Sequence, residues 1–124
     1  MWNNAILCLG SNTDCEANLR SAVGLLRAYF SSIRFSEAIY TEPIGLSDSG
    51  LFLNQVAVAG TNASLEEVRR AVKAMEKRLG RMSDSKQKGK IPIDIDLLLW
   101  NGTILKPADW EKEYVQLLFR SVAD

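Results

Sequence analysis

The chain has 124 residues, enough for one domain with a hydrophobic core and too few for two ordinary domains, so we expect a single domain over residues 1–124. Fifteen basic and fifteen acidic residues give a net charge of zero, which argues against binding to nucleic acid or a membrane surface through bulk charge. No histidine is present, which excludes histidine-based triads and zinc sites with histidine ligands. With no transmembrane run and no visible signal peptide, we expect a cytoplasmic protein in which Cys8 and Cys15 are reduced thiols.

Apolar periodicity and turn residues predict the elements in chain order. We expect strands over residues 4–9, 33–41, 51–60 and 93–100, and helices over residues 14–30, 65–79 and 109–123. Thr13 with Glu16, and Ser64 with Glu67, have the spacing of capping boxes at the starts of the first two helices. The polar segment 81–90 is expected to be a flexible loop.

The predicted order is β-α-β-β-α-β-α. This order indicates an α+β protein with a ferredoxin-like antiparallel sheet and helices packed on it. The second and third strands should pair antiparallel across a loop of residues 42–50, which is longer than a hairpin needs. Long loops inside compact domains tend to carry function.

The strand 93–100 carries two carboxylates, Asp94 and Asp96, among large apolar side chains. Side chains at positions i and i+2 of a strand lie on the same face, with Cα atoms about 6.5–7 Å apart. Two anions on one face of a buried strand repel each other and are costly to desolvate. A divalent cation relieves both effects, so the pair predicts a Mg²⁺ site of the carboxylate–phosphate type. The alternative is an edge strand with solvated carboxylates.

Basic residues are concentrated just before this strand. Residues 66–90 contain nine of the fifteen: Arg69, Arg70, Lys73, Lys77, Arg78, Arg81, Lys86, Lys88 and Lys90. For Arg69, Arg70, Lys77 and Arg78 we favour a solvated helix face. For Arg81, Lys88 and Lys90 we favour contacts with phosphate oxygens, since cations beside a metal–carboxylate pair suit a polyphosphate ligand.

Several short motifs, in order, resemble one family. They are Leu9-Gly10-Ser11-Asn12, Tyr40-Thr41-Glu42-Pro43-Ile44-Gly45, Phe52-Leu53-Asn54, Glu76-x-x-x-Gly80-Arg81 and Ile93-Asp94-Ile95-Asp96-Leu97-Leu98. The set resembles the 6-hydroxymethyl-7,8-dihydropterin pyrophosphokinases of folate biosynthesis. The resemblance implies an ATP-dependent transferase that moves diphosphate from ATP to the hydroxymethyl oxygen of the pterin and releases AMP, with two Mg²⁺ ions.

The resemblance also implies roles for individual residues. Asp94 and Asp96 would hold the metals and act with Arg81 in catalysis. The pterin would contact Thr41, Pro43, Ile44, Phe52, Asn54 and Tyr114. The nucleotide would contact Glu76, Lys88, Lys90, Leu97 and Lys112. An amide suits a pterin edge because it both donates and accepts hydrogen bonds, and aromatic rings stack on flat heterocycles. The alternatives are a core phenylalanine at 52, a strand-end amide at 54 and an exposed helix glutamate at 76.

The chain also departs from the family pattern. Lys88 and Ile91 stand where the family usually has Trp and Arg, and Ser83 replaces a basic residue. Two other functions therefore stay open: a catalytically weak protein that binds a pterin or nucleotide, and a ferredoxin-like interaction domain with an incidental carboxylate pair. Small-molecule substrates are the expected partners, with no prediction of oligomeric state.

Overall fold

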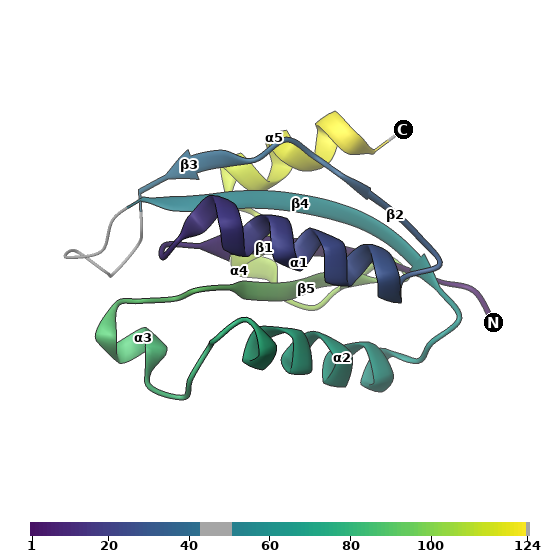
Figure 1. Cartoon of the computed structure of the whole chain (residues 1–124). Coiled ribbons are helices and arrows are strands. Elements are labelled where there is room, and N and C mark those ends of the chain that lie inside the picture. The colour runs from purple at the N-terminus through teal and green to yellow at the C-terminus, as the bar shows by residue number, and fades with distance from the viewer. Residues whose placement is uncertain (43–50, 124) are drawn as a thin grey trace.

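The computed structural model describes residues 1–42 and 51–123, which form one antiparallel layer of strands with helices on both faces (Figure 1). The strands are β1 (Asn3–Ser11), β2 (Ser32–Phe35), β3 (Ile39–Thr41), β4 (Phe52–Thr61), β5 (Asp94–Trp100) and β6 (Thr103–Ile104). The helices are α1 (Cys15–Tyr29), α2 (Leu65–Arg78), α3 (Ser85–Lys88), α4 (Pro107–Trp110) and α5 (Glu113–Val122).

The six strands make one antiparallel sheet in the order β2-β4-β1-β5-β6, with β3 also paired to β4. If β2 and β3 are counted as one strand, the first four strands have the order 2-3-1-4 of a ferredoxin-like βαββαβ unit. The predicted fold class and the antiparallel pairing across the loop are confirmed. None of the helices in the described part of the chain is long and apolar enough to cross a membrane.

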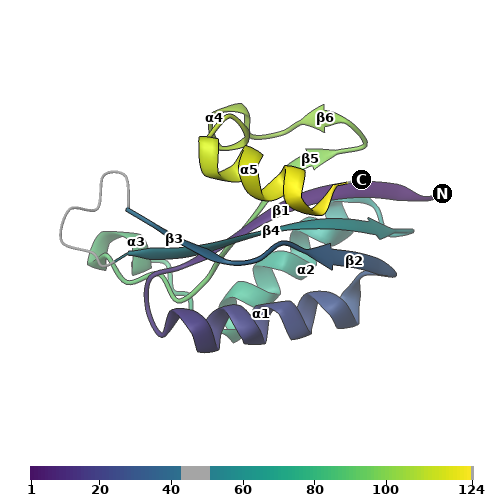
Figure 2. The ribbon, with the colours of Figure 1, turned by 90° about the horizontal axis from the view of Figure 1, so that it is seen from above.

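Helices α1 and α2 cover one face of the sheet, and α4 and α5 lie over the other (Figure 2). Alternation along the strands gives each face its own cluster. Leu7, Leu9 and Ile95 belong to the larger core under α1 and α2. Cys8 and Val56 belong to a smaller core that includes residues of α5. β1 lies between β4 and β5, β4 lies between β1 and β2, and most residues of both strands are buried.

Of the local predictions, one capping box is confirmed and the other is wrong. The capping box at Ser64 and Glu67 is confirmed, with both reciprocal hydrogen bonds present. The capping box at Thr13 is wrong: the N-cap of α1 is Asp14, whose side chain makes no cap hydrogen bond, and the Thr13 hydroxyl instead donates to Asn12 Oδ1. Cys8 and Cys15 are free thiols, as expected.

Three predicted segments differ from the structure. The strand over 33–41 is two strands, β2 and β3, because Ser36 uses its backbone N–H and its hydroxyl to bond the backbone of Val56. The C-terminal helix is divided into α4 and α5 by residues 111–112. The segment expected to be a loop over 81–90 contains the short helix α3, with Ser85 buried. Pro43 and Ile44 of the expected pterin loop lie outside the described residues.

Candidate functional site

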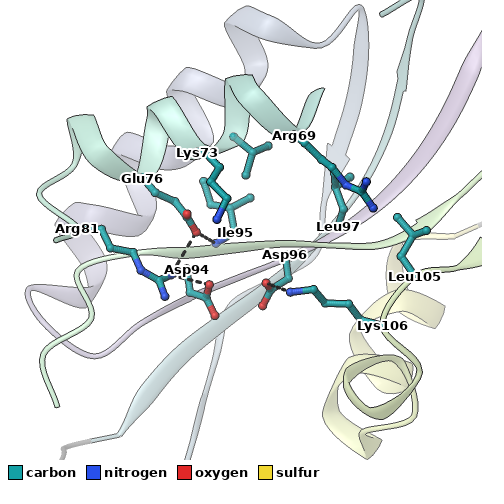
Figure 3. Close-up of a pocket in the computed structure, with 11 residues that line it drawn as sticks. Arg69, Lys73, Glu76, Arg81, Asp94, Ile95, Asp96, Leu97, Leu105 and Lys106 are labelled. Atoms are coloured by element: carbon teal, nitrogen blue, oxygen red, sulfur yellow. Dashed lines mark hydrogen bonds and ion pairs between the residues drawn. The ribbon is translucent and has the colours of Figure 1, made fainter. Parts of the chain in front are cut away.

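The two carboxylates lie two residues apart on β5 and project to the same side of the strand (Figure 3). Asp94 Oδ1 accepts a hydrogen bond from Arg81 Nη1 at 2.7 Å, and Asp96 Oδ1 accepts one from Lys106 Nζ at 2.7 Å. Their side chains are 37% and 24% exposed, respectively. The carboxylates are therefore partly buried and ion-paired, rather than solvated on an open edge.

The pKa of Asp96 is shifted by the two effects expected from the sequence, which are desolvation and repulsion between the two carboxylates. Burial, and next the neighbouring charge of Asp94, raise the pKa of Asp96 from 3.8 to about 6. The hydrogen bond and charge of Lys106 act in the opposite direction and only partly offset this rise. The pair thus retains an unfavourable concentration of negative charge even when each carboxylate has a cationic partner.

The donor set fits Mg²⁺. This ion prefers oxygen ligands and commonly takes one or two carboxylates, with water and substrate phosphates filling its other positions. Among the described residues, no group of three or more His, Cys, Asp or Glu side chains is arranged to hold a metal by itself. Asp94 and Asp96 alone supply too few ligands, so further oxygens would have to come from a ligand and water.

Beside the carboxylates lies a cavity of about 400 Å³ between α2, β5 and the start of α4 (Figure 3). Four cations and three carboxylates are among its lining residues: Arg69, Lys73, Arg81 and Lys106, with Glu76, Asp94 and Asp96. Leu97 and Leu105 contribute apolar surface. A cavity with this lining suits a ligand that has a phosphate chain and an apolar part.

Sequence reasoning missed three of these cations. The sequence pattern favours a solvated helix face for Arg69 and indicates no individual role for Lys73. The helical spacing of Arg69, Lys73 and Glu76 could have placed all three on one face of α2. No local pattern identified Lys106, which comes from a separate segment and reaches the site only through the tertiary fold.

Glu76 is buried, with 8% of its surface exposed, so the alternative of an exposed helix glutamate is wrong. Its Oε2 accepts from the Ile95 backbone N–H at 2.7 Å and from Arg81 Nη1 at 3.2 Å. On one side of Ile95 lies β1, and on the other side β6 pairs only with Leu99 and Trp100, further along β5. The contact with Glu76 therefore gives the Ile95 N–H a hydrogen-bond acceptor where β5 has no neighbouring strand. Glu76 therefore joins α2 to β5 and holds Arg81 against Asp94.

A second group of polar residues lies across the sheet from the carboxylates. Gly10 of β1 pairs with Asn54 of β4 on one side and with Asp94 of β5 on the other. Neighbouring strands are about 4.8 Å apart, so Asn54 and Asp94 are roughly 10 Å apart across the glycine. A Cβ at Gly10 would lie 3.3 Å from Asn54 Oδ1 and 3.7 Å from Phe52. Glycine thus leaves an uncrowded strip of backbone beside the amide.

The Asn54 side chain is held in place from within the protein. It is buried, and its Nδ2 donates to Thr41 Oγ1 at 2.6 Å and to the Phe52 carbonyl at 3.3 Å. Because these contacts use the nitrogen, the orientation of the carbonyl oxygen near Gly10 is fixed as well. Thr41, Phe52 and Asn54, predicted together from sequence, are close together in the structure.

Tyr114 lies at the start of α5 and packs against the cluster that contains Cys8 and Val56. Burial, and next the charge of Cys8, raise the pKa of Tyr114 above its ordinary value of 10.0, with smaller contributions from Asp109, Asp96 and Asp94. The phenol is neutral, and its ring packs on the cluster that contains Cys8, whose strand partner in β5 is Asp96. Its ring is half-buried, as is that of Phe52.

The predicted lysines lie elsewhere. Lys88 pairs with Asp84 at 3.0 Å, Lys112 pairs with Asp109 at 2.9 Å, and Lys90 is exposed. None of the three lines the cavity beside the carboxylates. Ile91 is buried, and its backbone is hydrogen-bonded to Asn12 in both directions, so this position contributes to packing.

These features define an α+β protein with a paired-carboxylate site beside a cation-lined cavity. Residues 6–124 match the model of the 7,8-dihydro-6-hydroxymethylpterin-pyrophosphokinase (HPPK) family. The chain belongs to this family, as the ordered motifs had indicated.

Curated relatives agree with this membership. A 2-amino-4-hydroxy-6-hydroxymethyldihydropteridine pyrophosphokinase of Porphyromonas gingivalis is 28% identical, covering 94% of this chain and 88% of the relative. The folate synthesis bifunctional protein of Arabidopsis thaliana is 27% identical over 92% of this chain, and a mitochondrial counterpart from Pisum sativum is 31% identical over 89%. The matches span only 26% and 23% of those two plant proteins.

Proposed function

We propose that this chain transfers diphosphate from ATP to 6-hydroxymethyl-7,8-dihydropterin, with release of AMP. The observation that best supports this reaction is the row formed by Asn54, Gly10 and Asp94 across three adjacent strands. It provides a fixed amide at one end and a carboxylate pair with a cation-lined cavity at the other. A flat heterocycle on the amide side would direct its substituent toward a phosphate chain on the carboxylate side.

The chemistry is a displacement at the β-phosphorus of ATP. The pterin hydroxymethyl oxygen forms a bond to the β-phosphorus. The bond between the β-phosphorus and the oxygen that bridges it to the α-phosphorus breaks, and this oxygen leaves as part of AMP. The hydroxyl proton is released. Mg²⁺ held by Asp94 and Asp96 would neutralise charge on the phosphate oxygens. Arg81 fixes Asp94 through the 2.7 Å contact, and positioning of this kind accounts for much of the catalysis in phosphoryl transfer.

On the pterin side, Asn54 would hold the heterocycle edge and Thr41 would fix the amide. Phe52 and Tyr114 are proposed as stacking partners, and Pro43 and Ile44 as backbone contacts. On the nucleotide side, Leu97 would give an apolar wall and Glu76 would order Arg81. Lys88, Lys90 and Lys112 remain predicted nucleotide contacts that would require their side chains to move.

The test is an assay for AMP release with ATP, Mg²⁺ and the pterin. We expect AMP only when all three are present, and none from Asp94→Asn, whose side chain has nearly the same shape without the charge. Glu66→Gln, an exposed carboxylate on α2, is the matched control and should behave as the unsubstituted protein.

The outcomes separate the candidate functions. Absence of AMP at saturating substrates would contradict the proposed transfer. Calorimetry with the pterin alone would then test the pterin-binding alternative, and absence of binding would favour an interaction domain. The cytoplasmic location stays a prediction, since one plant relative is named as mitochondrial.

A further inference from the structure

Lys106 is the cation beside Asp96, and no known motif predicted it. It stands at the N-cap of α4, where its carbonyl accepts from the Trp110 N–H at 2.9 Å. The backbone is thus fixed by the helix, while the side chain, which is part of the cavity lining, extends to Asp96 (Figure 3). Within the described residues, Asp96 is the side chain to which the ammonium group is bonded.

The two cations that pair with Asp94 and Asp96 differ in how firmly they are held. Arg81 contacts Asp94, Glu76 and the carbonyl of Ile93, all through Nη1, and its side chain is 27% exposed. Lys106 makes one side-chain contact and is 47% exposed. A lysine has a flexible four-carbon stem and three rotatable donors. Arg81 is therefore a fixed support, whereas Lys106 can exchange one anionic partner for another without disturbing the fold.

We propose that Lys106 is a movable counter-ion that occupies Asp96 in the free protein and passes to a nucleotide phosphate when a metal ion takes its place. The inference deepens the proposed function by assigning this residue to the nucleotide side of the same site. A divalent cation on Asp96 repels the ammonium group, which then lies in a cavity beside Arg69 and Lys73. Phosphate oxygens are the anions that the reaction would bring there.

This exchange makes metal and nucleotide binding depend on each other. Without nucleotide, a metal ion must displace Lys106 from Asp96 and break the ion pair that the ammonium group has in the free protein. With nucleotide present, the displaced ammonium gains a phosphate contact. Lys106 should therefore weaken the binding of metal alone and strengthen the binding of metal together with nucleotide. The coupling between the two ligands is reciprocal and measurable.

The test uses Mn²⁺ as the metal probe, since oxygen ligands that accept Mg²⁺ also accept Mn²⁺. Loss of the electron paramagnetic resonance signal of free Mn²⁺ gives its affinity with and without α,β-methylene-ATP, an analogue that cannot be cleaved at the relevant bond. The variants are Lys106→Met and, as a second form that keeps a polar end, Lys106→Gln. Lys77→Met removes an exposed lysine of α2 that does not line the cavity and is the matched control.

In both Lys106 variants we expect Mn²⁺ alone to bind about fivefold more tightly. The factor by which the analogue enhances Mn²⁺ binding should fall about tenfold. Lys77→Met should leave both quantities as in the unsubstituted protein. Unchanged coupling in Lys106→Met, weaker binding of Mn²⁺ alone, or an equal effect of Lys77→Met would overturn the proposal.

These measurements contain no pterin and no turnover. If the Lys106 variants show the expected coupling but pterin-dependent AMP release is absent, the counter-ion role stands and the proposed reaction fails. If AMP is released and the coupling is unchanged, the reaction stands and the role of Lys106 fails.

Discussion

The two faces of the sheet are built from the same strands but differ in content. Under α1 and α2, side chains such as Leu7, Leu9 and Ile95 form a continuous apolar core. The neighbouring positions Cys8, Gly10 and Asp96 face the side of α4 and α5, where apolar packing gives way to polar and small residues. One face thus supplies most of the stability, which lets the other carry charges that oppose folding.

The largest expected effect concerns the polar face. Asp96→Asn should lower pterin-dependent AMP release by about a thousandfold, since a metal ligand that stabilises transition-state charge contributes several kcal/mol. The free energy of unfolding should change by less than about 1 kcal/mol, because the lost partner Lys106 is half exposed. Chemical denaturation and the AMP assay measure the two quantities.

Glu37→Gln is the control for this variant, because Glu37 is exposed and its carboxylate has no hydrogen-bond partner among the described residues. Global unfolding of Asp96→Asn would assign a structural role to the carboxylate and remove the contrast between the faces.

A core substitution should show the opposite pattern. Leu7 is fully buried, and Leu7→Ala should lower the free energy of unfolding by about 2–5 kcal/mol through lost burial and a residual cavity. Below its melting transition the variant should retain turnover per folded molecule, as judged by AMP release and circular dichroism together. A loss of turnover in fully folded Leu7→Ala would mean that the faces are not separable.

Gly10→Ala tests the strip between the amide and the carboxylates. The new methyl group would lie 3.3 Å from Asn54 Oδ1, tighter than ordinary contact, and would occupy the proposed pterin side. We expect pterin affinity to fall about tenfold to a hundredfold, with α,β-methylene-ATP affinity unchanged, both measured by calorimetry. Equal losses for both ligands would show that the substitution disturbs the whole site.

The smallest expected effect concerns the thiol under the polar face. Burial, followed by the charges of Asp96 and Asp94, raises the pKa of Cys8 from 9.0 to about 12. The neutral thiol is favoured in the folded state, so its stabilising contribution is complete below pH 9 and is lost as the pH rises toward 12. At pH 8 a thiol reagent should modify Cys15 readily and Cys8 only after unfolding. Rapid modification of both thiols in the folded protein would contradict this burial.

Much of the fold could be predicted because its signals are local. Alternation along the strands, helical spacing and the Ser64 cap specified the order of elements and the antiparallel sheet. The break at Ser36 could not be predicted, because it depends on hydrogen bonds to Val56, twenty residues away. The α1 cap was predicted wrongly because the side chain of Thr13 has a competing partner in Asn12.

The site was predictable where chemistry and spacing coincide. Asp94 and Asp96 were identifiable because charge on a buried strand is energetically unusual. Arg69 and Lys73 were harder to assign, since exposed helix cations are common and their orientation depends on how α2 packs against β5. Lys106 reaches Asp96 only because α4 follows β6 back across the cavity. Its contribution is set by tertiary structure and has no sequence signal of its own.

The most direct test of the proposed reaction is to follow ATP by ³¹P nuclear magnetic resonance in the presence of Mg²⁺ and 6-hydroxymethyl-7,8-dihydropterin. Diphosphate transfer predicts equal amounts of AMP and a pterin diphosphate ester, with no ADP. Formation of ADP, or no change in ATP that depends on the pterin, would contradict the account.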